Sequence, residues 1–257
     1  MAVVISNDRV GPHYYLLRLK VPVINNTWAP GRFLHIKVSH RQTHDPLLRR
    51  PLSLFDVNYK NNTVSLLYCL VGRGTQILSK TKANTELDIL GPLGQGFSLR
   101  NNQEILIIGG GMGIAPLFLL TKFLGKNNNL KIFLGGNEKE SLLFFTQQFE
   151  KMSGELRLAT IDGSLGYQGT VLDLWEEQAN DFSPDFIYTC GPPPMLSRIQ
   201  ALAARKKLPG EVSLEERMGC GVGVCLSCVC ATGEGNQRVC KEGPVFQLSE
   251  VIFDDRN

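Results

Sequence analysis

The chemically most specific feature of the sequence is a group of cysteines near its C-terminal end. The chain has seven cysteines in 257 residues, and five of them lie between Cys220 and Cys240. The spacing Cys220-x4-Cys225-x2-Cys228, followed by Cys240, is one with which proteins bind a [2Fe–2S] cluster. Two bridged irons need four converging thiolates, and a glycine-rich loop can point backbone N–H groups at the sulfurs. We therefore predict these four cysteines as the metal ligands.

A zinc site and free core thiols account less well for these cysteines. A structural zinc site more often has two separated C-x2-C pairs, and the spacing from Cys220 to Cys225 does not fit that pattern. Burial as a free core thiol accounts for one cysteine but not for four at this spacing. Cys230 would share a face with Cys228 in an extended chain. We leave Cys230 out because the four-ligand set is complete without it.

A glycine-rich turn indicates a second kind of site. Gly109-x-Gly111-x-Gly113 lies between an apolar run at residues 105–108 and a helix predicted over residues 116–124. Glycines in such a turn let the backbone approach a pyrophosphate, which the helix N-terminus also favours. Tight packing of a strand on a helix needs glycine as well. The strand–turn–helix context favours a dinucleotide site.

Two further segments lie where an open α/β sheet would bind a ligand. Cys190-Gly191-Pro192 ends the predicted strand at residues 186–190, although Cys190 is equally suited to be a small buried hydrophobic residue. Asp162-Gly163-Ser164 is a candidate for the adenosine ribose. A carboxylate there suits the two hydroxyls of NAD and repels the 2′-phosphate of NADP, while a polar turn accounts for the same residues.

Two segments of the first hundred residues carry groups that bind phosphate. Arg50-Pro51-Leu52-Ser53 opens a strand-like segment, and Gly72-Arg73-Gly74-Thr75 is predicted as a second glycine turn. Arginine can hold a pyrophosphate through two hydrogen bonds, and Gly-Thr supplies N–H and hydroxyl donors. Taken separately, each segment could be a surface turn.

The elements that must position these residues fall into three parts. Residues 1–100 show short strands, at 14–20, 33–38 and 63–70, separated by turn residues, which indicates an antiparallel barrel or sandwich. Residues 101–210 alternate strands with helices, which indicates a parallel α/β sheet. Residues 211–257 form a small module organised by its metal.

Composition excludes several classes of protein. The net charge of +3, from 27 basic and 24 acidic residues, is too small to indicate nucleic acid binding. No apolar run approaches the roughly 18–20 residues of a transmembrane helix. The first ten residues include Asn7, Asp8 and Arg9, unlike a secretory signal. We expect a cytoplasmic protein, in which clustered cysteines bind metal more often than they form disulfides.

Together these motifs closely resemble the ferredoxin reductase superfamily, and more narrowly the electron-transfer subunit of type B dihydroorotate dehydrogenase. The resemblance covers essentially the whole chain, and its most specific parts are residues 220–228 and 238–246. It implies an N-terminal antiparallel β-barrel that binds FAD, a central α/β parallel-sheet domain that binds NAD, and a C-terminal iron–sulfur module.

The resemblance also implies roles for individual residues. Arg50 would contact the flavin phosphates and Ser53 would lie near the isoalloxazine, within the motif that Pro51 and Leu52 complete. Leu67, Tyr68 and Cys69 match the strand that lines the flavin, and Gly74 and Thr75 match its phosphate turn. The family often has arginine where this sequence has Cys69, and Arg73 is available to compensate. A cysteine matching Cys190 lies near the nicotinamide in the wider superfamily, so we take it as the catalytic candidate.

The functional hypothesis follows from this set of cofactors. Electrons from a partner's FMN would enter singly through the cluster, and FAD would collect two and pass a hydride to NAD+. The partner would be the catalytic subunit that oxidises dihydroorotate in pyrimidine synthesis, in a heterotetramer of two copies of each. His13, His35, His40 and His44 form no evident acid–base set. The alternatives are a sulfhydrogenase or ferredoxin:NADP oxidoreductase subunit and, from another class, a zinc-stabilised binding module.

Overall fold

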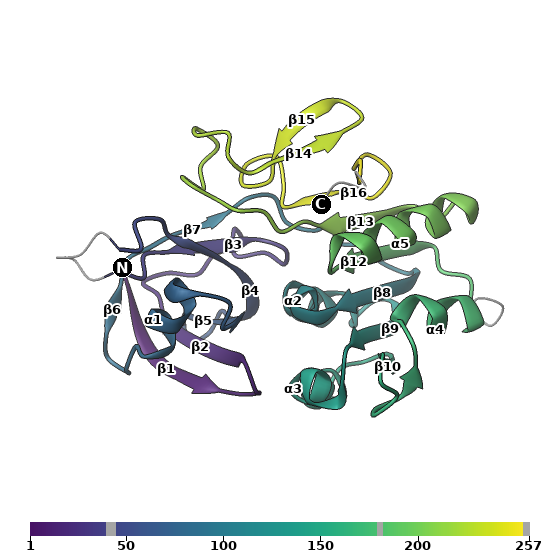
Figure 1. The fold of residues 1–257 in the computed structure, drawn as a ribbon, viewed down its shortest axis with the longest axis horizontal. Helices are drawn as coiled ribbons and strands as arrows, with labels where there is room; N and C mark the ends of the chain where they lie inside the picture. Colours follow the sequence, from purple (N-terminus) through teal and green to yellow (C-terminus); the bar gives the residue numbers. More distant parts are fainter. Residues whose placement is uncertain (40–44, 179–181, 254–257) are drawn as a thin grey trace.

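The computed structural model describes residues 1–39, 45–178 and 182–253. It contains a barrel, an α/β sheet and a C-terminal cysteine module, which sits above the junction of the other two in Figure 1. His40 and His44 lie outside the described residues. The expectation that the histidines form no catalytic set therefore concerns only His13 and His35 here.

The N-terminal part is an antiparallel barrel. Its sheet has the order β6-β1-β2-β5-β4-β3-β7. The two edge strands, β6 and β7, are separated in the chain only by Asp88, so the two edges of the sheet meet there. The barrel elements are β1 (Ala2–Arg9), β2 (Tyr14–Lys20), β3 (Phe33–Ile36), β4 (Arg50–Asn58), β5 (Thr63–Cys69), α1 (Arg73–Ser79), β6 (Glu86–Leu87) and β7 (Ile89–Leu93). The predicted barrel is confirmed.

The two faces of β3 serve different parts of the molecule. Alternate residues of a strand point to opposite faces. Leu34 and Ile36 belong to the apolar core of the barrel, whereas Phe33 packs in a cluster with residues of the cysteine module. All four residues of β3 are buried, because the module covers the outer face of this strand.

The central part is a mainly parallel sheet with helices on both faces. Its order is β11-β10-β9-β8-β12-β13-β16, and only β16 runs antiparallel to its neighbour. The elements are β8 (Glu104–Gly110), a 3-10 turn (Gly111–Gly113), α2 (Ile114–Leu124), β9 (Asn129–Gly136), α3 (Lys139–Phe149), β10 (Glu155–Thr160), β11 (Tyr167–Gln168), α4 (Val171–Gln178), β12 (Phe186–Cys190), α5 (Pro193–Arg205), β13 (Gly210–Ser213) and β16 (Val245–Gln247). The strand order reverses between β8 and β12, where ligands of such sheets bind.

The second sheet and the barrel share one apolar core. Buried residues of α2 and α3 form a cluster with one face of the sheet and with barrel residues such as Phe55. The rings of Phe55 and Phe118 stack with centroids 4.4 Å apart. Lys122 on α2 lies 2.5 Å from Asp56 on β4. These contacts fix α2, and the turn that precedes it, against the barrel.

Several elements differ from the sequence expectations. The helix predicted over residues 116–124 begins two residues earlier, at Ile114, because proline is tolerated in the first turn of a helix. Gly74 and Thr75 lie in the first turn of α1 instead of an open glycine turn. The strand β13 spans the expected domain boundary at residue 210, since β13 and β16 both belong to the second sheet.

The C-terminal module contains little regular structure. Its hairpin consists of β14 (Val229–Thr232) and β15 (Gly235–Arg238). No helix or strand occurs between Leu214 and Cys228. No helix in the described part of the chain is long and apolar enough to cross a membrane.

Candidate flavin, nicotinamide and iron–sulfur site

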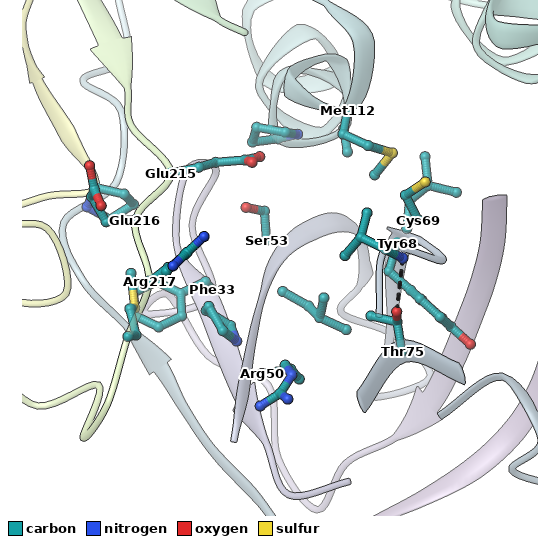
Figure 2. Close-up of a pocket in the computed structure, with 18 of the residues that line it drawn as sticks. Phe33, Arg50, Ser53, Tyr68, Cys69, Thr75, Met112, Glu215, Glu216 and Arg217 are labelled. Atoms are coloured by element: carbon teal, nitrogen blue, oxygen red, sulfur yellow. Dashed lines mark hydrogen bonds between the residues drawn. The ribbon is translucent and has the colours of Figure 1, made fainter. Parts of the chain in front are cut away.

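A pocket of about 810 Å³ lies where the barrel, the second sheet and the cysteine module meet. The predicted flavin residues line it: all of residues 50–53, all of residues 67–69, and Thr75. Gly74 is the only predicted flavin residue that does not. Figure 2 shows Arg50, Ser53 and Cys69 around this pocket, with Met112 and Glu215 from the second sheet across from the barrel.

The Arg50 side chain packs closely against the backbone of Gly74. A Cβ atom at Gly74 would lie 2.4 Å from Nε of Arg50, so only glycine leaves room for this guanidinium. Nη1 of Arg50 donates to the backbone carbonyl of Leu48 at 2.7 Å. Oγ1 of Thr75 accepts a hydrogen bond from the N–H of Val71 at 3.1 Å. The Thr75 hydroxyl donates to the Gly72 carbonyl at 3.0 Å, so the donors available to a phosphate at this end of the pocket are the Arg50 guanidinium and backbone N–H groups in the first turn of α1.

Cys69 contributes no positive charge to the pocket. Burial raises the pKa of its thiol, so the side chain is neutral. Arg73, the candidate for compensation, instead lies 2.5 Å from Asp45 in an exposed ion pair and does not line the pocket. Arg50 is therefore the cation that the predicted flavin motif supplies.

The sequence analysis missed one side of the pocket, formed by residues 214–218 directly after β13. Glu215 and Arg217 reach into the pocket in Figure 2. The Glu215 side chain is exposed to the open pocket, where partial desolvation by the pocket walls raises the pKa of its carboxyl, and its charge in turn acts on Cys190. The available signal was positional: ligands of open α/β sheets bind at the carboxyl ends of the strands, and residue 214 follows one.

The glycine turn and Cys190 meet at the point where the strand order reverses. Cys190 pairs with Gly109 in the sheet. A Cβ at Gly113 would lie 2.5 Å from the backbone carbonyl of Cys190, and Gly111 has a φ of +55° that favours glycine. Cys190 itself is 1% exposed and does not line the pocket. Burial raises the pKa of its thiol well above the ordinary value.

Asp162 lies in a polar turn after β10. Its Oδ1 accepts hydrogen bonds from the N–H and the hydroxyl of Ser164, at 3.0 and 2.6 Å. Those hydrogen bonds lower the pKa of Asp162, first of all the one from the Ser164 hydroxyl. Ser164 also accepts from the N–H of Lys139 at the start of α3. The carboxylate is thus fixed at the carboxyl end of the strand next to β9.

Backbone N–H groups surround the cysteine sulfurs. Sγ of Cys220 accepts from the N–H groups of Val222, Val224 and Cys225 at 3.3–3.4 Å. Sγ of Cys240 accepts from the N–H of Gly223 at 3.1 Å. The backbone donors lower the pKa of Cys220, that of Val222 most. A loop that stabilises negative sulfur suits metal binding, because thiolates are the ligands.

The four cysteines form two pairs. The thiols of Cys220 and Cys225 contact each other, and so do those of Cys228 and Cys240. Hydrogen bonds, led by that from the Ser227 hydroxyl, lower the pKa of Cys225 to about 6, whereas burial raises the pKa of Cys240 to about 12. No three His, Cys, Asp or Glu side chains among the described residues are arranged to hold a single metal ion. Two pairs of thiols are the ligand set that two bridged irons require.

The cysteine loop is held from the hairpin side by Arg238. Its Nη1 donates to the carbonyl of Gly223 at 2.8 Å, and its Nε donates to Glu242 at 2.9 Å. The Arg238 guanidinium lowers the pKa of Glu242 to about 2. This ion pair therefore anchors the middle of the loop to the chain on either side of Cys240.

Comparison with solved structures defines the class of protein. An NADH-dependent reduced ferredoxin-NADP oxidoreductase aligns with a TM-score of 0.89 and 27% identity, over 99% of this chain and 91% of that chain. The ferredoxin reductase of carbazole 1,9a-dioxygenase aligns with a TM-score of 0.64 at 19% identity, over 80% and 65% of the two chains, and shows the fold alone. The fold is that of the ferredoxin reductases.

Comparison of sequences defines the family within that class. The model of the iron–sulfur cluster binding domain of dihydroorotate dehydrogenase B matches residues 215–252. Proteins named dihydroorotate dehydrogenase B (NAD(+)), electron transfer subunit, from Desulforamulus reducens and Enterococcus faecalis are each 39% identical over 98% of both chains. The chain belongs to this family of electron transfer subunits, and the predicted resemblance is confirmed.

Proposed function

We propose that the chain is the electron-transfer subunit of a dihydroorotate dehydrogenase, passing electrons from the FMN of a catalytic subunit through a [2Fe–2S] cluster and FAD to NAD+. One observation carries this proposal: a single pocket brings the flavin motif together with the glycine turn and with the segment that leads into the cysteine loop. When bound, FAD exchanges single electrons with a cluster and electron pairs with a nicotinamide. Every other step below concerns what the residues of the chain do.

The barrel side of the pocket would bind and orient FAD. Arg50 and the first turn of α1, which includes Gly74 and Thr75, offer donors for the phosphates. Residues 51–53 and 67–69 form two neighbouring walls, with the Ser53 hydroxyl facing the interior in Figure 2. Buried Tyr68 is fixed by its hydroxyl, which donates to Asn7 at 3.0 Å. These groups bind the cofactor and exclude water from it.

The second sheet would bind NAD+ over the same pocket. Gly109, Gly111 and Gly113 bring backbone close to a pyrophosphate at the start of α2. Asp162, fixed by Ser164, would accept hydrogen bonds from the ribose hydroxyls. Cys190 would shape the nicotinamide site as a neutral thiol from behind the glycine turn.

The cysteine loop would hold the cluster through the two thiol pairs. Cys220 and Cys225 would bind one iron, and Cys228 and Cys240 the other, with thiolate charge balanced by the surrounding N–H groups. Cys230 is half-buried in strand β14 and belongs to neither of the two thiol pairs. It is not a ligand in this proposal.

The tip of the cysteine loop would dock on the catalytic subunit, in a heterotetramer with two copies of each chain. Val222, Val224 and Leu226 are 45%, 79% and 61% exposed and lie between the predicted ligands Cys220 and Cys228. Exposed apolar side chains of this kind mark protein interfaces.

Val224→Asp should weaken binding of the catalytic subunit roughly tenfold. Val23→Asp, at an exposed apolar position on the barrel, is the control and should leave binding unchanged.

The structural likeness to a ferredoxin-NADP oxidoreductase supports one alternative, namely that the chain is a subunit of a complex of that kind. The sequence relatives favour the dihydroorotate enzyme, because their identities are higher and their names agree. Purification of the co-expressed complex, followed by iron, acid-labile sulfide, zinc and flavin analysis, tests the proposal. We expect FAD, two irons and two sulfides for each copy of this chain. A colourless protein containing zinc, or recovery with a hydrogenase and no dihydroorotate activity, would contradict it.

A further inference from the structure

The outer face of β3 carries a buried histidine that the proposed function does not use. Leu34 and Ile36 point into the barrel core, so Phe33 and His35 point out of it. Phe33 packs in the same cluster as Cys228. His35 is 0% exposed, because the cysteine module covers it.

His35 connects the flavin strands with the cysteine loop. A Cβ at Gly221 would lie 2.5 Å from Nδ1 of His35, so the loop backbone rests directly on the ring. The backbone of Cys220, a proposed iron ligand, also interacts with the ring. In the barrel sheet, His35 pairs with Pro51, which lines the flavin pocket. One residue thus contacts both parts of the proposed electron path.

The ring has a hydrogen-bonding requirement that packing does not satisfy. The backbone groups of Cys220 and Arg49 lie near the ring, but within the described residues neither Nδ1 nor Nε2 makes a hydrogen bond of ordinary geometry. An imidazole ring carries at least one N–H donor in either protonation state. An unpaired buried donor destabilises the fold, and an apolar side chain would fill this space without that cost. A histidine at this position needs a reason beyond packing.

We propose that His35 is a positioning residue for electron transfer, holding the Cys220-Gly221 backbone against the strand that borders the flavin pocket. This inference rests on the proposed function. Groups around cluster ligands orient them and tune the reduction potential. His35 should therefore affect the potential of the cluster and the rate at which electrons pass between cluster and flavin.

The first test compares His35→Leu and His35→Asn in the purified complex. The readouts are iron and FAD content, the EPR spectrum and midpoint potential of the cluster, and the rate of cluster reduction after mixing with NADH. We expect His35→Leu to shift the spectrum and potential and to slow cluster reduction about tenfold. His35→Asn keeps an N–H donor and should recover most of the rate. His13→Asn, at an exposed barrel histidine, is the control.

A wild-type spectrum, potential and rate in His35→Leu would overturn the proposal. Wild-type protein without iron or flavin would instead refute the proposed function, so the two failures are distinguishable.

The second test uses two glycines of the same loop and remains informative if His35→Leu loses its cluster. Gly221 and Gly223 have φ values of +73° and +82°, so alanine strains the backbone at both. A Cβ at Gly223 would meet Lys241 at 2.7 Å instead of His35. We expect His35→Ala to restore part of the iron retention that Gly221→Ala loses, and none of that lost in Gly223→Ala. Equal recovery in both, or recovery in neither, would overturn the proposal.

Discussion

The flavin pocket and the cysteine loop concentrate chemistry in opposite ways. The pocket gathers side chains from β4, β5, α1, the turn before α2 and the segment after β13. The first and the last of these elements are more than 160 residues apart in the chain. The loop carries three of its four cysteines within nine residues and has no helix or strand of its own. Packed secondary structure fixes the pocket, whereas hydrogen bonds and thiol contacts fix the loop.

The two regions should therefore differ in how far their structure depends on a bound cofactor. The pocket is supported by the shared apolar core of barrel and sheet, so it should keep its shape without FAD. The loop brings its thiols together in two pairs and has no helix or strand of its own to hold them, so its order should depend on the metal.

The largest expected effect is that of removing a ligand from the loop. Cys225→Ser should abolish electron transfer to the catalytic subunit, because the two-thiol set for one iron is incomplete. Oxidation of NADH by artificial dyes, which needs only the pocket, should persist. Cys230→Ser is the matched control and should keep both activities and its iron. Coupled turnover in Cys225→Ser would show that the cluster is not on the route.

Removing the cation of the flavin motif should have the next largest effect. Arg50→Leu deletes hydrogen bonds between charged groups that contribute about 1.5–3 kcal/mol, so FAD affinity should fall about 10–100-fold. Titration of the flavin-free protein with FAD measures this loss, and iron content should stay unchanged. Arg18→Leu removes an exposed barrel arginine paired with Asp8 and serves as the control. Equal FAD affinity in Arg50→Leu and wild type would remove Arg50 from the flavin site.

Two glycines of the turn allow steric contact and backbone strain to be tested separately. Gly113→Ala places a methyl group 2.5 Å from the Cys190 backbone and should destabilise the protein by about 1–3 kcal/mol. Gly111→Ala meets nothing within 4 Å and should lose only about 1 kcal/mol, from its φ of +55°. Thermal unfolding of both variants measures the difference. The reverse order of stabilities would mean that the turn does not pack on Cys190.

The smallest effect concerns Glu215 and pH. Desolvation raises its pKa in the folded state, so the folded protein binds more protons than the unfolded one. That contribution to stability is present at low pH and is lost as pH rises through the folded pKa. Because the side chain still faces solvent in the open pocket, Glu215→Gln should raise the melting temperature only slightly, by about 1 °C, near neutral to alkaline pH and should flatten its pH dependence.

Glu216→Gln removes the same charge one residue later, from a side chain that is exposed like that of Glu215, and should change the melting temperature little. A melting temperature for Glu215→Gln that is lowered, or that keeps the wild-type pH dependence, would show that Glu215 is not held in a desolvated site.

The sequence by itself determined the local chemistry and most elements that carry it. Strand β2 and strand β12 were predicted with their observed bounds, because turn residues flank them and their composition is strongly strand-like. The ligand spacing from Cys220 to Cys228 is a property of one short loop, so it needs no long-range information. The flavin motif at residues 50–53 was found through the family resemblance, since each part could have been a surface turn.

Tertiary structure alone decided which distant residues meet. Glu215 lines the pocket because the strand before it, β13, belongs to the second sheet. The glycines and cysteines that follow residue 211 instead predict this segment as part of the cysteine module. His35 is buried between barrel and loop, and no local pattern distinguishes it from the exposed His13. Such positions depend on how a strand face is covered by chain more than 180 residues later. Contacts of that range are set by packing of the whole fold, which local sequence patterns do not encode.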